Sequence, residues 1–395
     1  MKVDPIILPS KKIDLTTELV PAVRQLLREG LDDSFQKSCV RVGAFNLYSE
    51  GLKAELVGQL RVDMHTVLKL GSKELLKHVE LMRYVNSIRK NAFPLTLHVG
   101  ELSGDRIFIL TEQCRKHVSL LDKIYRERTT PREFDSILSQ VFDILQAIHS
   151  VTDRSIKELE YLPATVDPFS KRLRSKIGDI LKADVALAPM LDNEGMLNGA
   201  PCSSIKTLLD HATKVCSRNC KRGALRLLHG DIHAANILVR RNGPHGYRVR
   251  LIDPNPELGF SQVLYDIGKL FHWTDPVGWA KATPSQCKAS FSFNKQTNKW
   301  KLSASLSKFS QAAEMRRKYV EAKIEEYAEH LRRQYGADFE AMLAISRASA
   351  HVGMAAILKH EDQRRYVLAH AVKQLRKAMI QPQYSSPRFR LAIMA

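Results

Sequence analysis

The chain has 395 residues, of which 44% are hydrophobic and 26% charged, so it can bury a large core and is not typical of a disordered protein. No stretch approaches the ~18 uninterrupted apolar residues of a membrane span, and the N-terminus lacks the apolar core of a secretory signal, which together predict a cytoplasmic protein. The net charge of +19 is spread widely, without a zinc finger or an aromatic-interleaved ribonucleoprotein motif. We therefore interpret the positive net charge as an indication of the sign of the charge on the substrate, rather than of nucleic-acid binding.

The first part of the chain predicts a small β-rich unit. Branched residues interrupted by glycines favour strands between residues 39 and 70, and an apolar stripe favours a helix capped by Ser72. The expected elements, in chain order, are a helix over residues 15–27, strands over 40–42, 56–62 and 66–70, a helix over 72–88, and strands over 95–101 and 106–112 joined by a turn at 103–105.

Helical patterns dominate the rest of the chain. The expected helices cover residues 118–125, 134–148, 169–181, 205–215, 263–273, 310–335, 339–358 and 363–379, with a hairpin over 289–302 and an irregular tail from 381. Strands, one helix and two more strands, followed by a mostly helical region, predict an α+β fold of two lobes. We place the boundary at residue 114, which gives an N-lobe over 1–114 and a C-lobe over 115–395.

The stretch His229-Gly-Asp-Ile-His-Ala-Ala-Asn236, followed by Arg250-Leu-Ile-Asp253, carries the chemistry. Phosphoryl transfer needs a group that accepts the substrate hydroxyl proton and oxygen ligands that hold Mg²⁺ on the nucleotide phosphates. A carboxylate at Asp231, an amide at Asn236 and a second carboxylate at Asp253 supply these groups. Their spacing equals that of the protein-kinase loop H-R-D-x-x-x-x-N, with Gly230 in place of arginine.

The residues around this loop predict how the two carboxylates meet. An apolar run over 237–239, a turn cluster over 241–246 and an alternating run over 247–252 favour a β-hairpin. Such a hairpin would bring Asp253 beside Asp231 at its open end. The alternative is a surface turn with solvated acids, but loop, hairpin and second aspartate would then coincide by accident.

At these residues the chain resembles the aminoglycoside phosphotransferase and choline kinase superfamily, small-molecule kinases with a bilobal protein-kinase-like fold. The resemblance extends over about residues 40–379 and is most specific at 229–236 and 252–253, less so at 265–270. It implies Asp231 as catalytic base or orienting group for the acceptor hydroxyl, and Asn236 and Asp253 as Mg²⁺ ligands.

The same resemblance implies supporting roles on both sides of the loop. His229 would brace the loop without touching phosphate. Asp266 would be a buried acid that orients the loop, with a helix-surface acid as the alternative. Lys69 would contact the nucleotide phosphates, paired with Glu80 in the next helix, and Glu74 is the competing partner.

The nucleotide site follows from the segment between the lobes. Backbone groups of Glu112 and Cys114 would contact adenine. The expected phosphate loop at residues 48–51 departs from the usual pattern, because it contains one glycine and no Gly-x-Gly-x-x-Gly.

The predicted activity is an ATP- or GTP- and Mg²⁺-dependent transfer of phosphate to a hydroxyl of a small molecule: a sugar, polyol, nucleoside or antibiotic that can carry an anionic group. A protein kinase is the first alternative, disfavoured by Ile252-Asp-Pro254 and by only about ten residues between Asp253 and the next helix. The second is an inactive kinase-shaped module that binds nucleic acid or anionic lipid, disfavoured because Asp231, Asn236 and Asp253 are all present. The pattern does not indicate an oligomeric state.

Overall fold

The computed structural model describes residues 45–49, 56–61, 65–101, 106–152, 167–220, 225–243, 246–275, 277–278, 280, 284–307 and 310–380. The predicted helix over 15–27, the strand over 40–42, the turn over 103–105 and the tail from 381 lie outside the described residues, as does part of the expected phosphate loop.

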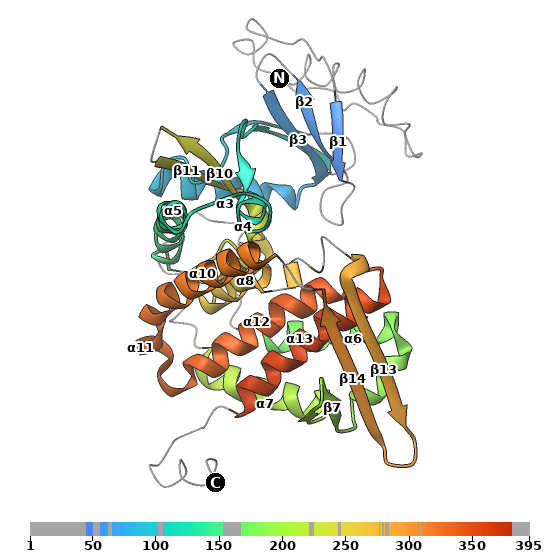
Figure 1. The fold of residues 1–395 in the computed structure, drawn as a ribbon. Helices are drawn as coiled ribbons and strands as arrows, with labels where there is room; N and C mark the ends of the chain where they lie inside the picture. Colours follow the sequence, from blue (N-terminus) through green and yellow to red (C-terminus); the bar gives the residue numbers. More distant parts are fainter. Residues whose placement is uncertain are drawn as a thin grey trace, which may run out of the picture.

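Five antiparallel strands form the sheet of the N-terminal part, in the order β1-β2-β3-β5-β4 (Figure 1). The strands are β1 Phe45–Ser49, β2 Leu56–Arg61, β3 His65–Ser72, β4 Thr96–Glu101 and β5 Arg106–Glu112. Lys69 lies in the middle strand, opposite Val57 of β2 and Ile109 of β5. The central position fixes the backbone of Lys69 from both sides, so its side chain projects from a rigid support.

The helix α3 (Leu75–Ile88) packs on this sheet through a small apolar cluster. Leu75 and Val79 of the helix meet Ile107 and Ile109 of β5, which agrees with the predicted apolar stripe. The predicted cap is wrong, however. Ser72 belongs to β3, where it pairs with Arg106, and α3 begins after Glu74 without a side-chain cap. Sheet pairing continues through the serine, so the helix begins three residues later than expected.

Helices build most of the second part, below the sheet in Figure 1. They are α4 Leu120–Tyr125, α5 Pro131–His149, α6 Ser170–Ala183, α7 Ile205–Asn219, α8 Leu264–Thr274, α10 Gln311–Ala328, α11 Arg332–Tyr335, α12 Phe339–Ala355 and α13 Glu361–Ile380. Short 3-10 turns cover Val185–Met190, Ala234–Asn236, Pro256–Leu258, Pro284–Gln286, Glu329–Leu331 and Gly336–Asp338. The predicted α+β fold of two lobes is confirmed, whereas the boundary at residue 114 remains a prediction.

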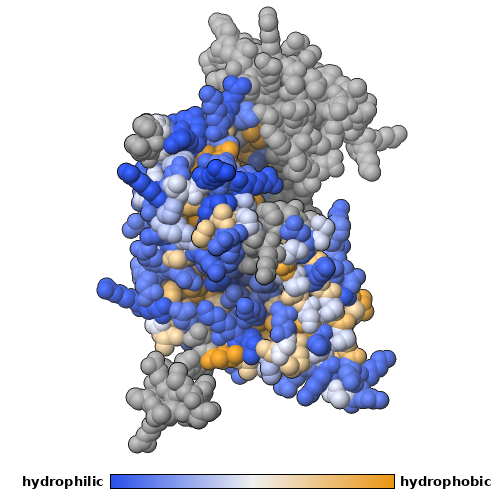
Figure 2. All heavy atoms as spheres, viewed as in Figure 1, coloured by the Kyte–Doolittle hydropathy of each residue, from blue (hydrophilic) through white to orange (hydrophobic). Residues whose placement is uncertain are grey.

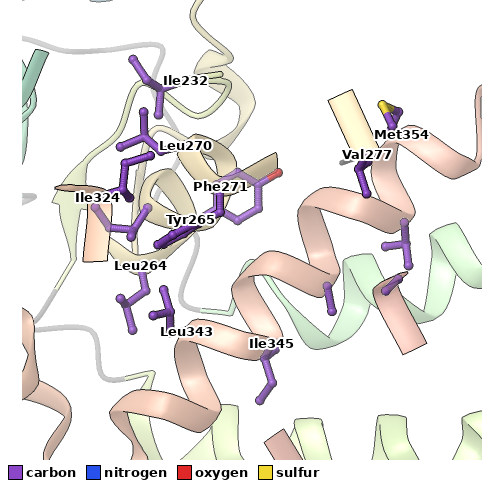
Figure 3. Close-up of a cluster of buried hydrophobic side chains, with 14 of the residues drawn as sticks. Ile232, Leu264, Tyr265, Leu270, Phe271, Val277, Ile324, Leu343, Ile345 and Met354 are labelled. Carbon is purple, nitrogen blue, oxygen red and sulfur yellow. The ribbon is translucent and has the colours of Figure 1, made fainter. Parts of the chain in front are cut away.

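The helix α8 lies at the centre of the main core. Its Leu264, Leu270 and Phe271 share one buried cluster with Ile324 of α10 and Leu343 of α12 (Figure 3). Nearly every residue of α12 is buried, because α8 and α13 pack against it from different sides. Packing against this enclosed helix holds α8 rigidly, so the polar side chains that α8 carries towards the loop 229–236 have fixed positions.

Three smaller sheets complete the second part. The catalytic hairpin is β10 (Ile237–Asn242) with β11 (Gly246–Leu251), and β6 (Val118–Ser119) joins it on the β10 side. The expected hairpin over 289–302 is β13 (Cys287–Asn294) with β14 (Lys299–Leu306), extended by β7 (Gly195–Leu197) and β8 (Ala200–Cys202). The remaining pair is β9 (Arg226–Leu227) with β12 (Phe260–Ser261).

Two helix predictions need correction. The helix expected from Val118 begins at Leu120, because Val118 and Ser119 pair with Val239 and Leu238 of β10. The single helix expected over 310–335 is interrupted by the 3-10 turn at Glu329–Leu331 and resumes as α11.

The surface agrees with the polar composition. On the face drawn in Figure 2, hydrophilic residues cover most of the described surface and hydrophobic residues form scattered groups. None of the helices in the described ranges combines the length and apolarity needed to cross a lipid bilayer.

Candidate active site

The loop 229–236 is held against the end of the catalytic hairpin by its backbone. Gly230 has φ +76°, and a Cβ at this position would lie 2.4 Å from the carbonyl oxygen of Asn255. The Asn255 amide donates to the His229 carbonyl at 2.7 Å. A side chain at residue 230 would therefore separate two segments that must touch, which explains why glycine occupies the position of the arginine in the protein-kinase loop.

Asp266 supports the loop from below. This carboxylate is fully buried at the start of α8 and accepts the amides of His229 (2.9 Å) and Gly230 (2.8 Å). His149 Nε2 lies 3.0 Å from Asp266 Oδ2 and adds a third contact from α5. Of the two interpretations of Asp266, the geometry corresponds to the buried acid beneath the loop.

His229 packs as a neutral side chain inside the fold. Its ring stacks on Phe93 with centroids 5.6 Å apart, and burial lowers the pKa of the imidazole despite the nearby Asp266 carboxylate. Nδ1 accepts the amide of Asp231 at 3.3 Å. His229 thus sets the backbone direction at Asp231, in line with the bracing role that the resemblance implies.

Asp231 is paired with Lys269, a residue to which the sequence analysis gave no role. Lys269 Nζ lies 2.8 Å from Asp231 Oδ1, and the lysine is 9% exposed against 34% for the aspartate. Burial alone would raise the pKa of Asp231, but the Lys269 ammonium and the His233 ring more than offset this and lower it. Asp231 is therefore ionised, with one oxygen fixed by Lys269.

The sequence contained a signal for Lys269. It lies three residues after Asp266 on α8, and residues three apart share one face of a helix. Since Asp266 was expected under the loop, Lys269 could have been expected on the same face. A lysine on that buried face would also be expected to have an anionic partner, because a buried ammonium is costly unless it is paired.

Asn236 closes the loop. The side-chain Nδ2 of Asn236 donates to the backbone carbonyl of Asp231 at 3.0 Å. The backbone carbonyl of Asn236 accepts the amide of Ile252, also at 3.0 Å. Because the Nδ2 side of the carboxamide is turned to the loop, Oδ1 is the atom available to an additional ligand. The last contact also ties the loop to the strand that leads to Asp253.

Asp253 has a strained backbone and faces a cavity. Its φ is +51°, a left-handed conformation that is uncommon for a residue with a side chain and recurs at functional sites. The carboxylate forms an ion pair with Lys69 of β3. Burial would raise the pKa of Asp253, but Lys69 outweighs this and lowers it, while the nearby Asp231 carboxylate acts in the opposite direction. The two aspartates are thus close enough to influence each other.

The cavity beside Asp253 has a volume of about 470 Å³ and lies between the sheet and the catalytic hairpin. Lys69 and Asp253, which pair with each other, are in its wall, as are the predicted hinge residues Glu112 and Cys114. The apolar part of the wall consists of Val67, Val79, Met82, Pro94, Ile109, Leu238 and Ile252. A largely apolar pocket with a few charged groups in its wall is the form that small-molecule and cofactor sites commonly take.

The two acids considered as partners of Lys69, Glu74 and Glu80, lie in different surroundings. Glu74 forms an ion pair with Lys77, on its own helix. Glu80 lies on α3 two residues after His78, which lines the cavity, while the ion pair of Lys69 is with Asp253. The expected pairing of Lys69 with Glu80 therefore stays a prediction.

Glu112 uses its side chain for structure rather than for a ligand. One carboxylate oxygen lies 3.3 Å from Arg250 Nη1 and accepts the amide of Leu95, and the Glu112 amide donates to the Leu95 carbonyl at 2.8 Å. Burial raises the pKa of the Cys114 thiol to about 11, so it is neutral. These side chains hold the segment between the lobes and leave its backbone to face the cavity.

The donor set fits a magnesium ion that is shared with phosphate. Within the described residues no group of three or more His, Cys, Asp or Glu could hold a metal by itself. One carboxylate at Asp253 and one amide oxygen at Asn236 are hard oxygen donors, and protein Mg²⁺ sites often have one or two such ligands completed by substrate phosphates and water.

Comparisons with known proteins agree on the fold. No protein-family model and no curated protein matches the sequence. Among solved structures, a candidate aminoglycoside phosphotransferase from Ralstonia eutropha JMP134 superposes with a TM-score of 0.55 at 13% identity, covering 92% of this chain and 99% of that one. The aminoglycoside phosphotransferase APH(2")-IIIa, solved with GDP and kanamycin, gives a TM-score of 0.50 at 13% identity over 91% of this chain and 98% of its own. The chain therefore has the bilobal protein-kinase-like fold of the aminoglycoside phosphotransferases.

Proposed function

We propose that this protein is a small-molecule kinase that transfers the terminal phosphoryl group of ATP or GTP to a hydroxyl of a small acceptor. The observation that carries the proposal is the convergence of Asp231, Asn236 and Asp253 at the open end of one hairpin, beside a cavity that also holds Lys69. Charge placement and positioning are what phosphoryl transfer requires of a protein.

The cavity supplies the nucleotide site. The base would lie between Val67 and Met82 on one side and Leu238 and Ile252 on the other. Since the Glu112 amide already donates to Leu95, its carbonyl would serve adenine together with the Cys114 amide. APH(2")-IIIa was solved with GDP, which supports a nucleotide in the corresponding place and leaves guanine as an alternative base.

Lys69 and Asp253 in the cavity wall supply the phosphate site. Lys69 would exchange its ion pair with Asp253 for the nucleotide phosphates, which releases the Asp253 carboxylate. Asp253 and Asn236 Oδ1 would then hold Mg²⁺, which neutralises charge on the phosphates when it is bound. The opening of one ion pair is thus compensated by contacts with the phosphates and the metal.

Asp231 would orient the acceptor. A bond forms between the acceptor oxygen and the terminal phosphorus, the bond from that phosphorus to the bridging oxygen breaks, and the nucleoside diphosphate leaves with the electron pair. The acceptor proton passes to Asp231 and then to solvent. Because the pKa of Asp231 is low, the carboxylate acts first as a hydrogen-bond acceptor that fixes the hydroxyl, and it takes the proton late in the reaction.

The test compares binding with turnover. Mg·ATP or Mg·GTP should raise the melting temperature of the wild-type protein, and Asp231→Ala should keep this increase while nucleoside diphosphate formation with a panel of hydroxylated metabolites and antibiotics is lost. Asp210→Ala, an exposed residue paired with Arg174, is the control for both measurements. Equal turnover in Asp231→Ala, or a wild-type protein indifferent to Mg²⁺ and nucleotide, would refute the proposal.

A further inference from the structure

A second cation, Arg172, lies near Lys269, on the side of the loop 229–236 that faces the helices α6 and α8. Arg172, in the first turn of α6, places its guanidinium 5.9 Å from the ring centre of Tyr265. Tyr265 and Lys269 are four residues apart on α8 and so share a face of that helix. Burial and the Arg172 charge both act to lower the pKa of Lys269, but the Asp231 carboxylate and Tyr265 outweigh them and the pKa is raised.

The fold leaves room for the Arg172 guanidinium. A Cβ at Gly353 of α12 would lie 2.6 Å from Arg172 Nη2, so a side chain at 353 would push the end of this flexible arginine aside. Glycine is a poorer helix former than alanine, and α12 is otherwise a well-packed helix rich in alanine. Glycine at 353 therefore lets the guanidinium lie directly against α12.

The partners of Arg172 are incomplete. Among the described residues no carboxylate lies within ion-pair distance of its guanidinium, and the buried Nε has no hydrogen-bond partner. The Asp231 carboxylate is already paired with Lys269. A partly buried guanidinium with unused donors is a ready site for a planar or tetrahedral oxyanion, which it can bind through two parallel hydrogen bonds.

We infer, on the basis of the proposed function, that the acceptor of this kinase is anionic and that Arg172 binds its anionic group. The acceptor is a polyol or sugar that carries a phosphate or carboxylate in addition to the hydroxyl that is phosphorylated. Lys269 holds Asp231 and adds positive charge on the same side. A polycationic acceptor such as kanamycin, seen in the complex of APH(2")-IIIa, would bring ammonium groups towards these two cations. The shared fold would then serve acceptors of opposite charge.

The first experiment measures nucleoside diphosphate release with acceptors that differ in charge and little else: glucose, glucose 6-phosphate and glucuronate, with kanamycin as the cationic member. We expect higher kcat/KM for the anionic members, and an increase in their KM of about tenfold in Arg172→Gln with kcat little changed. Arg174→Gln is the matched control, because Arg174 lies on the same helix but is exposed and paired with Asp210. A preference for glucose or kanamycin would overturn the inference and leave the kinase proposal intact.

The second experiment does not depend on the choice of acceptor. Inorganic phosphate is titrated onto the full-length protein saturated with Mg²⁺ and a non-hydrolysable ATP analogue, which fills the nucleotide phosphate site, at constant ionic strength. Phosphate should raise the melting temperature of wild type and Arg174→Gln, and this increase should be lost in Arg172→Gln.

Gly353→Ala provides an independent check, since its added methyl group displaces the guanidinium without removing it. This variant should also lose the phosphate response while its melting temperature without phosphate stays the same or rises. If Arg172→Gln and Gly353→Ala keep the wild-type response, the inference is wrong. Stabilisation by the Mg²⁺–nucleotide complex, measured in the same variants, reports separately on the proposed function and should be unchanged.

Discussion

Two aspartate–lysine pairs lie at the open end of the catalytic hairpin, and they differ in how the fold holds them. Lys269 and Asp231 come from the buried helix α8 and the loop above it, with side chains 9% and 34% exposed. Lys69 and Asp253 come from the sheet and the hairpin end and are 19% and 48% exposed. The first pair is fixed by packing, whereas the second lines the cavity where a ligand can replace it.

This difference assigns separate tasks to the two sides of the site. On the buried side, α8 places Asp266 under the loop backbone and Lys269 beside the Asp231 carboxylate. One rigid helix thus fixes both the backbone and the carboxylate of the loop. On the cavity side, the strained backbone of Asp253 holds a carboxylate that, under the proposed function, would change partners when nucleotide binds. Substitutions on the buried side should therefore affect stability and catalysis, and those on the cavity side should affect nucleotide affinity.

The largest effect is expected from Asp266→Asn, which keeps the size of the side chain. An amide cannot accept both loop amides, because its NH₂ group faces one of them, and the free energy of unfolding should fall by about 3 kcal/mol. Urea denaturation measures this. Asp210→Asn, at an exposed ion pair, should leave the midpoint unchanged. A similarly small change in Asp266→Asn would mean that the buried support is dispensable.

Next in size is Gly230→Ala. A left-handed alanine costs about 1–2 kcal/mol, and the clash with the Asn255 carbonyl adds to it. Gly243→Ala is a matched control, since Gly243 has the same φ of +76° and no atom within 4 Å of an added Cβ. The difference in unfolding free energy between the two variants isolates the close approach of the loop to residue 255. Equal losses would show that only the backbone conformation matters.

Lys269→Met should mainly affect catalysis and its dependence on pH. The pKa of Asp231 is lowered in the folded protein, so its contribution to stability is present above the unfolded value of about 3.9 and is lost as pH falls towards the folded pKa. Without Lys269, the pKa of Asp231 rises from its lowered position, because the effect of burial is then opposed mainly by the His233 and His229 rings. The rate of nucleoside diphosphate formation should then fall about tenfold to a hundredfold near pH 7, and its acid limb should move to higher pH.

Two further variants distinguish positioning from general damage to the fold. Lys269→Arg keeps the charge and should restore part of the rate and the low acid limb, while Lys206→Met, at an exposed lysine of α7, should match wild type. An acid limb that stays in place in Lys269→Met would contradict the pairing as the cause of the low pKa of Asp231.

The smallest effect is expected from Lys69→Met on the cavity side. Loss of one charged contact to phosphate should weaken binding of the Mg²⁺–nucleotide complex about tenfold. Because the pair with Asp253 is partly exposed, the urea midpoint should hardly change. Calorimetric titration with a non-hydrolysable analogue measures affinity, with Lys77→Met on α3 as control. Destabilisation comparable to that of Asp266→Asn would erase the distinction between the two sides.

Local patterns in the sequence were sufficient for most of the elements. The hairpin at 237–251 and the hairpin at 287–306 both follow from alternating residues around a turn. The start of α5 could also have been found. Thr130 and Glu133 form a capping box, each accepting the backbone amide of the other, so the helix begins at Pro131 rather than Phe134.

Long-range pairing was not readable from the sequence. The two residues of β6 have no strand pattern of their own and become a strand only because β10 offers its edge. The parallel pairing of β14 with β7 joins segments about a hundred residues apart. Such contacts depend on how helices bring the segments together, which no local periodicity encodes.

The sequence by itself determined the loop at 229–236, the hairpin behind it and the aspartate that follows, because short spacing and turn chemistry fix which atoms can be neighbours along a continuous chain. Only the tertiary structure decided which cations face these acids. Lys69, Lys269 and Arg172 come from β3, α8 and α6, elements that are far apart in the sequence, so only the folded chain sets their distances from the loop. Charge interactions depend on distance in space and on burial, and neither is a property of position in the sequence.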